Sequence, residues 1–159
     1  MRLRENSDRR RGATIVEMSF VVIALFGLLF LLIDLSWVVF AKASIQHAVR
    51  EGCRFAVTSQ TLTGMGHIAS IREVVRRNSM GFIGEPQLNN IQVRFYNPET
   101  LQPVSGPGSN AGGNLVIVAV ENFEVRPLVP LVRSADPIRF SVRAADRMEA
   151  SPMGIPPTP

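Results

Sequence analysis

The chain has 159 residues, a formal net charge of +4 at pH 7 and a single cysteine. One cysteine excludes an intramolecular disulfide framework and a four-cysteine zinc site. Five arginines fall within the first 12 residues, and the rest of the chain is close to neutral. Because the charge is concentrated in this short stub, it does not indicate a nucleic-acid partner.

A long apolar run follows the arginine-rich stub, and between Met18 and Ala41 its charged residue is Asp34. A bilayer core about 30 Å thick needs about 20 mainly apolar residues as helix. We therefore expect a transmembrane helix over about residues 18–41. The preceding arginines keep the N-terminus in the cytoplasm. A cleaved secretory signal is disfavoured, because the apolar core is too long and Lys42-Ala43-Ser44 is a poor cleavage site.

Two carboxylates accompany this run, Glu17 at its start and Asp34 towards its far end. An unpaired charge is costly in lipid, so each carboxylate needs a partner, a wet environment or a role. Glu17 either reaches the interface with its side chain or forms part of a processing signal with Gly12. Asp34 has no cation at i±3 or i±4. We expect it either at the outer interface, where Trp37 also fits, or in contact with another subunit.

The helical pattern continues past the membrane edge. Ile45, Val49 and Cys53 recur at helical spacing while polar residues fill the other face. This predicts one helix over residues 13–57, apolar all round in its first half and amphipathic in its second. Cys53 is then a small apolar residue on a helix face. A second helix is predicted at 67–78.

Downstream of the second helix, the hydrophobic period changes to alternation. The Pro- and Gly-rich stretch 97–113 indicates a long loop, and the two prolines in 126–131 indicate a rigid connection. Between and around these segments, the pattern predicts a three-stranded antiparallel sheet with strands at 91–95, 115–123 and 138–144.

The expected fold class is α+β, with a long N-terminal transmembrane helix continuing into a small soluble domain that has a second helix and the three-stranded sheet. Such a domain is small for an independent core, so the amphipathic half of the long helix should cover the apolar sheet face. The predicted organisation is a basic leader (1–12), the long helix (13–57), the α+β domain (58–148) and a Pro-rich disordered tail (149–159).

Motifs for catalysis or for metal binding are missing from the sequence. His47 and His67 lie 20 residues apart without HExxH spacing, and there is no GxSxG. Both histidines are expected to be solvated or in turns. We therefore expect no catalytic, cofactor-binding or metal-binding residues, no cofactor and no enzymatic activity.

Several segments together resemble the TadE-like family, the minor pilins or pseudopilins of the tight-adherence (Flp) pilus. The resemblance rests on RGATIVE at 11–17, the apolar run with its late acidic residue, and AVREGCRFA at 48–56. Weaker similarity lies in VENFEVRPLVPL at 120–131 and FSVRAADRME at 140–149. Two positions depart from the family pattern. Met18 stands where an aromatic residue often follows the glutamate, and Cys53 stands where alanine is common.

The resemblance implies that a membrane-embedded prepilin peptidase cuts after Gly12. Ala13 then becomes the N-terminus, and Glu17 is the fifth residue of the mature chain. Cleavage removes the arginines and creates an ammonium group at Ala13, which a buried carboxylate of a neighbouring subunit can neutralise. The helix N-terminus also favours the negative charge of Glu17.

The partners implied are the prepilin peptidase, other pilin and pseudopilin subunits, the inner-membrane assembly platform and the lipid bilayer. The implied location is the inner membrane, as a single-pass protein with a cytoplasmic N-terminus and a periplasmic or extracellular C-terminal domain. Whether the subunit enters a surface pilus for adhesion or secretion stays open at this point. The alternative is a single-pass periplasmic binding or enzymatic domain with an uncleaved signal anchor.

Overall fold

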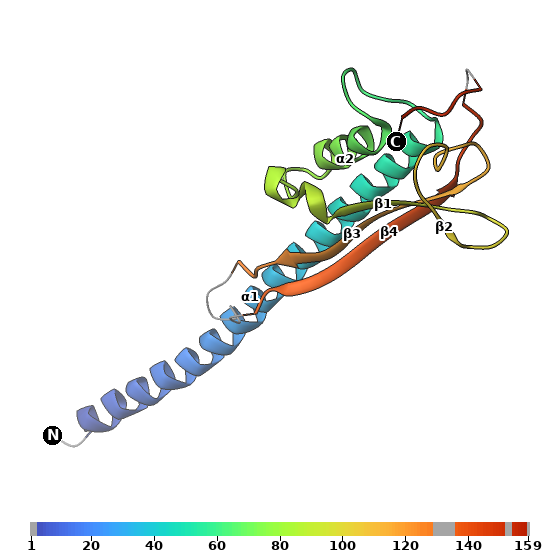
Figure 1. Ribbon diagram of the computed structural model, residues 1–159. Helices are drawn as coiled ribbons and strands as arrows, with labels where there is room; N and C mark the ends of the chain where they lie inside the picture. The colour runs from blue at the N-terminus through green and yellow to red at the C-terminus, as the bar shows by residue number, and fades with distance from the viewer. Residues whose placement is uncertain (1–2, 129–135, 152–153, 159) are drawn as a thin grey trace.

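The computed structural model describes residues 3–128, 136–151 and 154–158, and side chains from Thr14 onward within these ranges. It has the α+β architecture expected, with a small domain mounted on the C-terminal half of one long helix (Figure 1). The helix α1 (Leu3–Val57) has 55 residues, which corresponds to about 80 Å at 1.5 Å per residue. Its N-terminal half projects away from the domain (Figure 1).

The second half of α1 supplies the amphipathic stripe that the sequence predicts. Ile45, Val49 and Cys53 are buried in the core, whereas His47 on the opposite face is exposed. The helix ends at Val57 as predicted, but it begins within the basic leader, at Leu3. Leader and long helix are therefore continuous in backbone conformation.

The helix α2 (His67–Asn78) has the predicted bounds. It approaches α1 closely at Gly52, where an added Cβ would overlap the side chain of Val75. On its outer face, the carboxylate of Glu73 accepts hydrogen bonds from Arg76 and Arg77. These two guanidinium groups lower the pKa of Glu73 to about 2. The short 3-10 helix η1 (Glu85–Asn90) then leads into the sheet.

The sheet has four strands, so the prediction of three was wrong. The strands are antiparallel in the spatial order β2-β1-β3-β4. The missed strand is β2 (Pro103–Val104), which pairs with Phe95 and Tyr96. Two residues cannot display alternation, and a proline is compatible with an edge strand. The other three are β1 (Ile91–Tyr96), β3 (Leu115–Val125) and β4 (Ile138–Arg147).

A β-bulge in β3 keeps its apolar side chains on one face. The pairing register with β4 shifts between Val120 and Phe123, and Asn122 has a φ of 54°. The extra residue moves the buried positions from even to odd numbers. Val118 and Val120 are buried before the bulge, and Phe123 and Val125 after it. The whole length of β3 can therefore face α1.

The core lies between the sheet and the two helices. It contains Ile91 and Phe95 of β1 and Val142 of β4, together with the buried residues of β3 and α1. Ile138, which the alternation placed on the same apolar face, is 45% exposed at the start of β4. The sheet thus lies along α1, and β3 and β4 run beside the helix (Figure 1).

The C-terminal tail, which the sequence predicts to be disordered, makes defined contacts in its described part. Thr158 accepts a hydrogen bond from the backbone N–H of His67 (2.9 Å), and Pro157 accepts one from the side chain of Asn110 (2.8 Å). The rigid connection predicted at 126–131 lies within the described residues only as far as Leu128.

Candidate functional site

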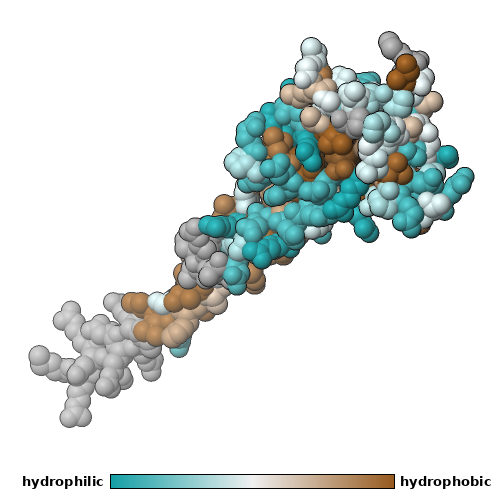
Figure 2. Space-filling view, in the orientation of Figure 1, coloured by the Kyte–Doolittle hydropathy of each residue, from teal (hydrophilic) through white to brown (hydrophobic). Residues whose placement is uncertain are grey.

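The candidate site is the part of α1 that projects from the domain. From Thr14 to Ile33 its side chains lie exposed, with Phe30 partly covered. These 20 residues extend over about 30 Å as helix, the thickness of a bilayer hydrocarbon core. Among the described residues, one helix is long and apolar enough to cross a membrane, and its most apolar window is unburied. Figure 2 shows this section as hydrophobic surface below a largely hydrophilic domain.

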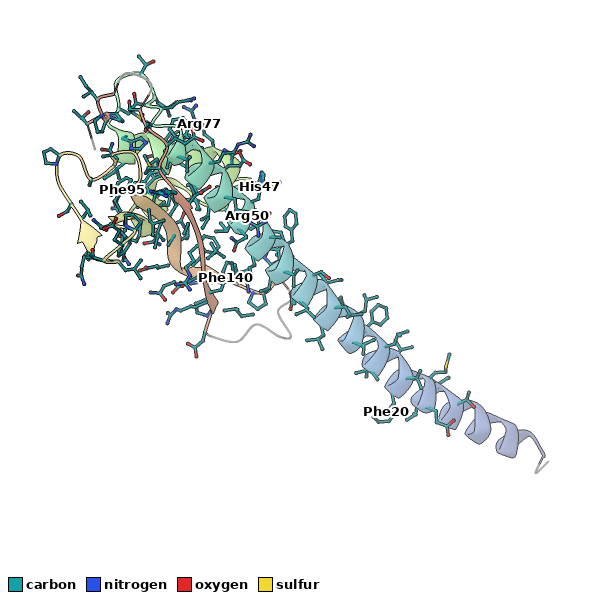
Figure 3. All side chains as sticks on the ribbon, turned by 90° about the vertical axis from the view of Figure 1, so that its right-hand side faces the viewer. Phe20, His47, Arg50, Arg77, Phe95 and Phe140 are labelled. Atoms are coloured by element: carbon teal, nitrogen blue, oxygen red, sulfur yellow. The ribbon has the colours of Figure 1, made fainter. Side chains whose placement is uncertain are left out.

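Large apolar side chains point outward all round this bare section, and Phe20 illustrates their direction (Figure 3). Phe20 is 71% exposed and Ile23 is 68% exposed. The hydroxyl of Ser19 donates a hydrogen bond to the carbonyl of Ile15 at 2.8 Å. This local bond satisfies the serine without water. The surface suits lipid or the apolar helix of another subunit, and is unsuited to water.

Glu17 lies near the N-terminal end of the bare section. Its side chain is exposed between Val16 and Met18, which are 56% and 60% exposed. Gly12 and Ala13 lie five and four residues earlier on the same helix. The structure therefore places the expected processing residues and Glu17 within about one and a half turns. Among the described side chains, no cation lies within ion-pair distance of Glu17.

Asp34 lies at the opposite end of the bare section, and the protein's own chain covers it. Its side chain is 4% exposed, and its Oδ1 accepts a hydrogen bond of 2.8 Å from the backbone N–H of Leu128. Leu128 follows β3, so the end of the sheet reaches down α1 to this carboxylate. Asp34 therefore has a partner within its own chain, and its place at the outer interface stays a prediction. A contact of Asp34 with another subunit stays a prediction.

Aromatic rings gather one turn beyond Asp34. Trp37 lies 5.4 Å from Phe82 and 6.2 Å from Phe40, measured between ring centroids. These rings join the projecting helix to the segment that follows α2. Trp37 is half-buried, which places an amphipathic ring at the end of a 30 Å apolar section, where membrane proteins carry them. The sequence indicated the position of Trp37 but not its partners.

The two histidines differ in environment. His47 is exposed as expected, but His67 is fully buried, so the expectation of a solvated or turn position was wrong for it. His67 Nδ1 lies 3.0 Å from the side-chain nitrogen of Asn110, and its ring stacks on Phe95. Burial lowers its pKa, and the backbone carbonyl of Ala56 opposes this in part. Asn110 lies in the long loop at 97–113, which has no hydrophobic period that could have indicated its contact with His67.

Cys53 is a core residue, as its place on the helix face predicted. It is 3% exposed, and burial together with the charge of Asp146 raises its pKa to about 11. A neutral, buried thiol is a poor nucleophile. Within the described ranges, no group of three or more histidine, cysteine, aspartate or glutamate side chains could hold a metal ion. Burial in the core thus accounts for the environments of Cys53 and His67.

A comparison with protein families finds a match over most of α1. The family model TadE, described as TadE-like protein, matches residues 12–54. The resemblance to the TadE-like family is confirmed over this segment. The TadE-like segment begins at Gly12 and includes Glu17 and Asp34. It ends before the sheet, so the weaker similarity at 120–131 and 140–149 lies outside it. No curated protein and no solved structure matches the chain.

The TadE-like family is structural and pilus-related, and its model matches this chain over residues 12–54. The apolar helix with a small α+β domain behind it fits a pilin-like role, and indicates a membrane anchor. The matched segment contains Gly12, Glu17 and Asp34, whose roles in processing and assembly stay predictions.

Proposed function

We propose that this chain is a TadE-like minor pilin or pseudopilin, a structural subunit in the assembly of a tight-adherence type IV pilus. The observation that carries the proposal is the TadE-like match at residues 12–54. The match begins two residues before the bare, 20-residue apolar section of α1 and includes all of it. A domain with a packed core behind this helix provides the second part of a pilin-like subunit.

Processing by a prepilin peptidase after Gly12 completes this proposal. Cleavage removes the five arginines of the leader, which otherwise hold the end of the helix in the cytoplasm. The new ammonium group at Ala13 lies four residues before Glu17, and residues at i and i+4 are neighbours on a helix. Glu17 can therefore neutralise its own N-terminus or that of an adjacent subunit, which lowers the cost of either charge in lipid.

The proposed topology follows from the same features. The arginine-rich end is cytoplasmic, and the domain from Ala41 onward is periplasmic or extracellular. The proposed partners are the peptidase, other pilin and pseudopilin subunits, the inner-membrane assembly platform and the bilayer. In this arrangement the exposed side chains around Phe20 face lipid in the membrane, and other apolar helices in an assembled fibre.

The assembly role of Glu17 can be tested in a strain that lacks the chromosomal copy. We expect a Glu17→Ala variant to reach the membrane fraction at wild-type level or above, because a charge has left the apolar section. Pilus formation should nevertheless fail. Ser19→Ala is the matched control, since it changes a polar residue half a turn away and should leave piliation intact.

Normal piliation with Glu17→Ala would show that Glu17 merely extends to the interface. A Glu17→Gln variant separates charge from size. If the carboxylate neutralises an ammonium group, Gln should fail as Ala does. Wild-type function of both variants would favour a membrane-anchored domain that keeps its leader.

A further inference from the structure

We propose that the membrane end of the domain docks into the outer leaflet of the bilayer and binds phospholipid there. This surface consists of Trp37, Phe40, Phe82, Arg126 and Leu128, and is called the membrane foot below. The inference rests on the proposed membrane anchoring of α1 and adds a second, separate contact of the soluble domain with lipid.

The first argument is the length of helix that the domain leaves bare. Thr14 to Ile33 is exposed, and the domain covers α1 from Asp34 onward. Twenty residues of helix equal about 30 Å, which is one hydrocarbon core. When this section spans the bilayer, the contact between Asp34 and Leu128 therefore lies at the boundary between acyl chains and headgroups. The domain has no intervening stalk to hold it above the membrane.

The second argument is the character of the surface at that level. Leu128 and Phe40 are 56% and 49% exposed. A hollow of about 490 Å³ lies beside Leu128. Its apolar lining comes from Trp37, Phe82, Phe123, Val125, Pro127 and Leu128, and its polar lining from Gln87, Glu124 and Arg126. Exposed apolar side chains around an aromatic cluster are typical of proteins at the membrane interface. The hollow is open, and its apolar side chains provide a surface against which part of an acyl chain can pack.

The third argument is charge. Arg126 is exposed and lines the same hollow as Leu128. Glu124 also lines this hollow, but its carboxylate is paired with Arg139 at 2.9 Å. Among the described side chains, no acidic group lies within ion-pair distance of Arg126. A guanidinium next to an apolar hollow matches a phospholipid, whose phosphate adjoins its acyl chains.

Docking of the foot also protects Asp34. The backbone N–H of Leu128 already covers its carboxylate, and lipid packed around the Leu128 side chain keeps that cover in place. A foot that lifted away would expose an aspartate at the edge of the hydrocarbon core, where charge is costly. Membrane docking and the contact with Asp34 should therefore stabilise each other.

The test uses the full chain in vesicles with phospholipids brominated along their acyl chains, which quench nearby fluorophores. In a Cys53→Ala background, a single cysteine that carries the fluorescent label replaces Phe26 in the bare section, Leu128 in the foot, or Met65. Met65 is 46% exposed and follows the end of α1. That end, at Val57, lies about 35 Å past Asp34 along the helix. The Leu128→Cys change leaves the hydrogen bond to Asp34 intact, because the backbone N–H donates it.

We expect strong quenching of labels at 26 and 128 and little at 65. Quenching at 26 with equal, weak quenching at 128 and 65 would overturn the membrane foot while leaving the anchor standing. No quenching at 26 would contradict both the anchor and the foot. A further outcome is that brominated lipid leaves the label at 128 unquenched while the label becomes shielded as the protein concentration rises. That result would assign the surface to a second copy of the chain and overturn the proposal.

The role of Arg126 has its own arm in this experiment. Adding anionic phosphatidylglycerol to neutral phosphatidylcholine vesicles should increase quenching at residue 128. Arg126→Gln should remove that increase, while Arg77→Gln, on the outer face of α2, should preserve it. An unchanged response in Arg126→Gln would overturn the contact between this guanidinium and the lipid phosphate.

Discussion

The carboxylate of Asp34 accepts a hydrogen bond of 2.8 Å from the backbone N–H of Leu128, which lies 94 residues later in the chain. This contact fixes the end of β3 to the point where α1 leaves the domain. It also removes the charged side chain from the apolar surface, since Asp34 is 4% exposed. One interaction thus both holds the chain after β3 against α1 and lowers the local cost of the charge.

Replacing Asp34 should loosen the end of the sheet. Asp34→Leu removes the acceptor of the Leu128 N–H, and an unsatisfied partner of a charged hydrogen bond costs about 1–3 kcal/mol. Asp34→Asn retains a side-chain oxygen and should cost less. Chemical unfolding in detergent and hydrogen exchange at the Leu128 amide measure the effect. Unchanged exchange at this amide in Asp34→Leu would contradict the importance of the contact.

The same pair of variants tests the predicted contact of Asp34 with another subunit. If its charge is recognised by a partner, Asp34→Asn should keep most of the stability but co-purify less with pilin partners. Asp34→Leu should insert normally and also lose partners. If Asp34→Asn retains its partners, the role of Asp34 lies within its own chain, and the intersubunit contact is wrong.

His67 should make the stability of the domain depend on pH. Burial lowers its pKa in the folded state, whereas in the unfolded chain histidine titrates near 6.5. Below pH about 6.5, the unfolded state binds a proton that the folded state resists. Stability should therefore fall as the pH drops through 6.5, by at most about 1.4 kcal/mol per pH unit.

The pH effect can be isolated by comparing melting temperatures at pH 8 and pH 5. His67→Gln should lose less stability than the wild type over this interval, although it is less stable at pH 8 because the buried site is altered. His47→Gln is the control, since His47 is exposed and should leave the wild-type pH dependence unchanged. The same pH dependence in His67→Gln as in wild type would contradict the assignment.

Gly52 should be intolerant of any side chain. An added Cβ overlaps the side chain of Val75 where α1 and α2 meet, and overpacking of a core costs about 1–3 kcal/mol. Gly52→Ala should lower the melting temperature of the full chain. Gly27→Ala is the matched control on the same helix, because its Cβ meets nothing within 4 Å. Equal stability of the two variants would show that the helices can separate without cost.

Strong periodicity made most of the fold predictable. The bounds of α2 and the end of α1 at Val57 follow from helical spacing and stop signals, and the buried stripe around Ile45 follows from amphipathicity. The segment from Arg9 to Glu17 was equally informative, because basic residues, a glycine and a carboxylate occur there in this order before an apolar run.

Features created by contacts distant in sequence were not predictable in this way. The strand β2 has two residues and exists through its pairing with Phe95 and Tyr96. The burial of His67 depends on Asn110, which comes from a loop without periodicity. The cover over Asp34 comes from a backbone N–H, and a backbone donor leaves no mark in the amino-acid pattern.

The N-terminus of the mature protein tests the proposed pilin role most directly. The full chain should be produced with its cognate prepilin peptidase, and its intact mass and N-terminal sequence determined from the membrane fraction. Gly12→Leu places a bulky side chain at the expected cleavage position, and Gly27→Ala serves as the control on the same helix.

We expect the wild type and Gly27→Ala to begin at Ala13, with the basic leader absent and Glu17 as the fifth residue. Gly12→Leu should accumulate as the full-length precursor. A wild-type protein that keeps its leader in the presence of active peptidase would contradict the processed-pilin assignment and favour an uncleaved membrane anchor.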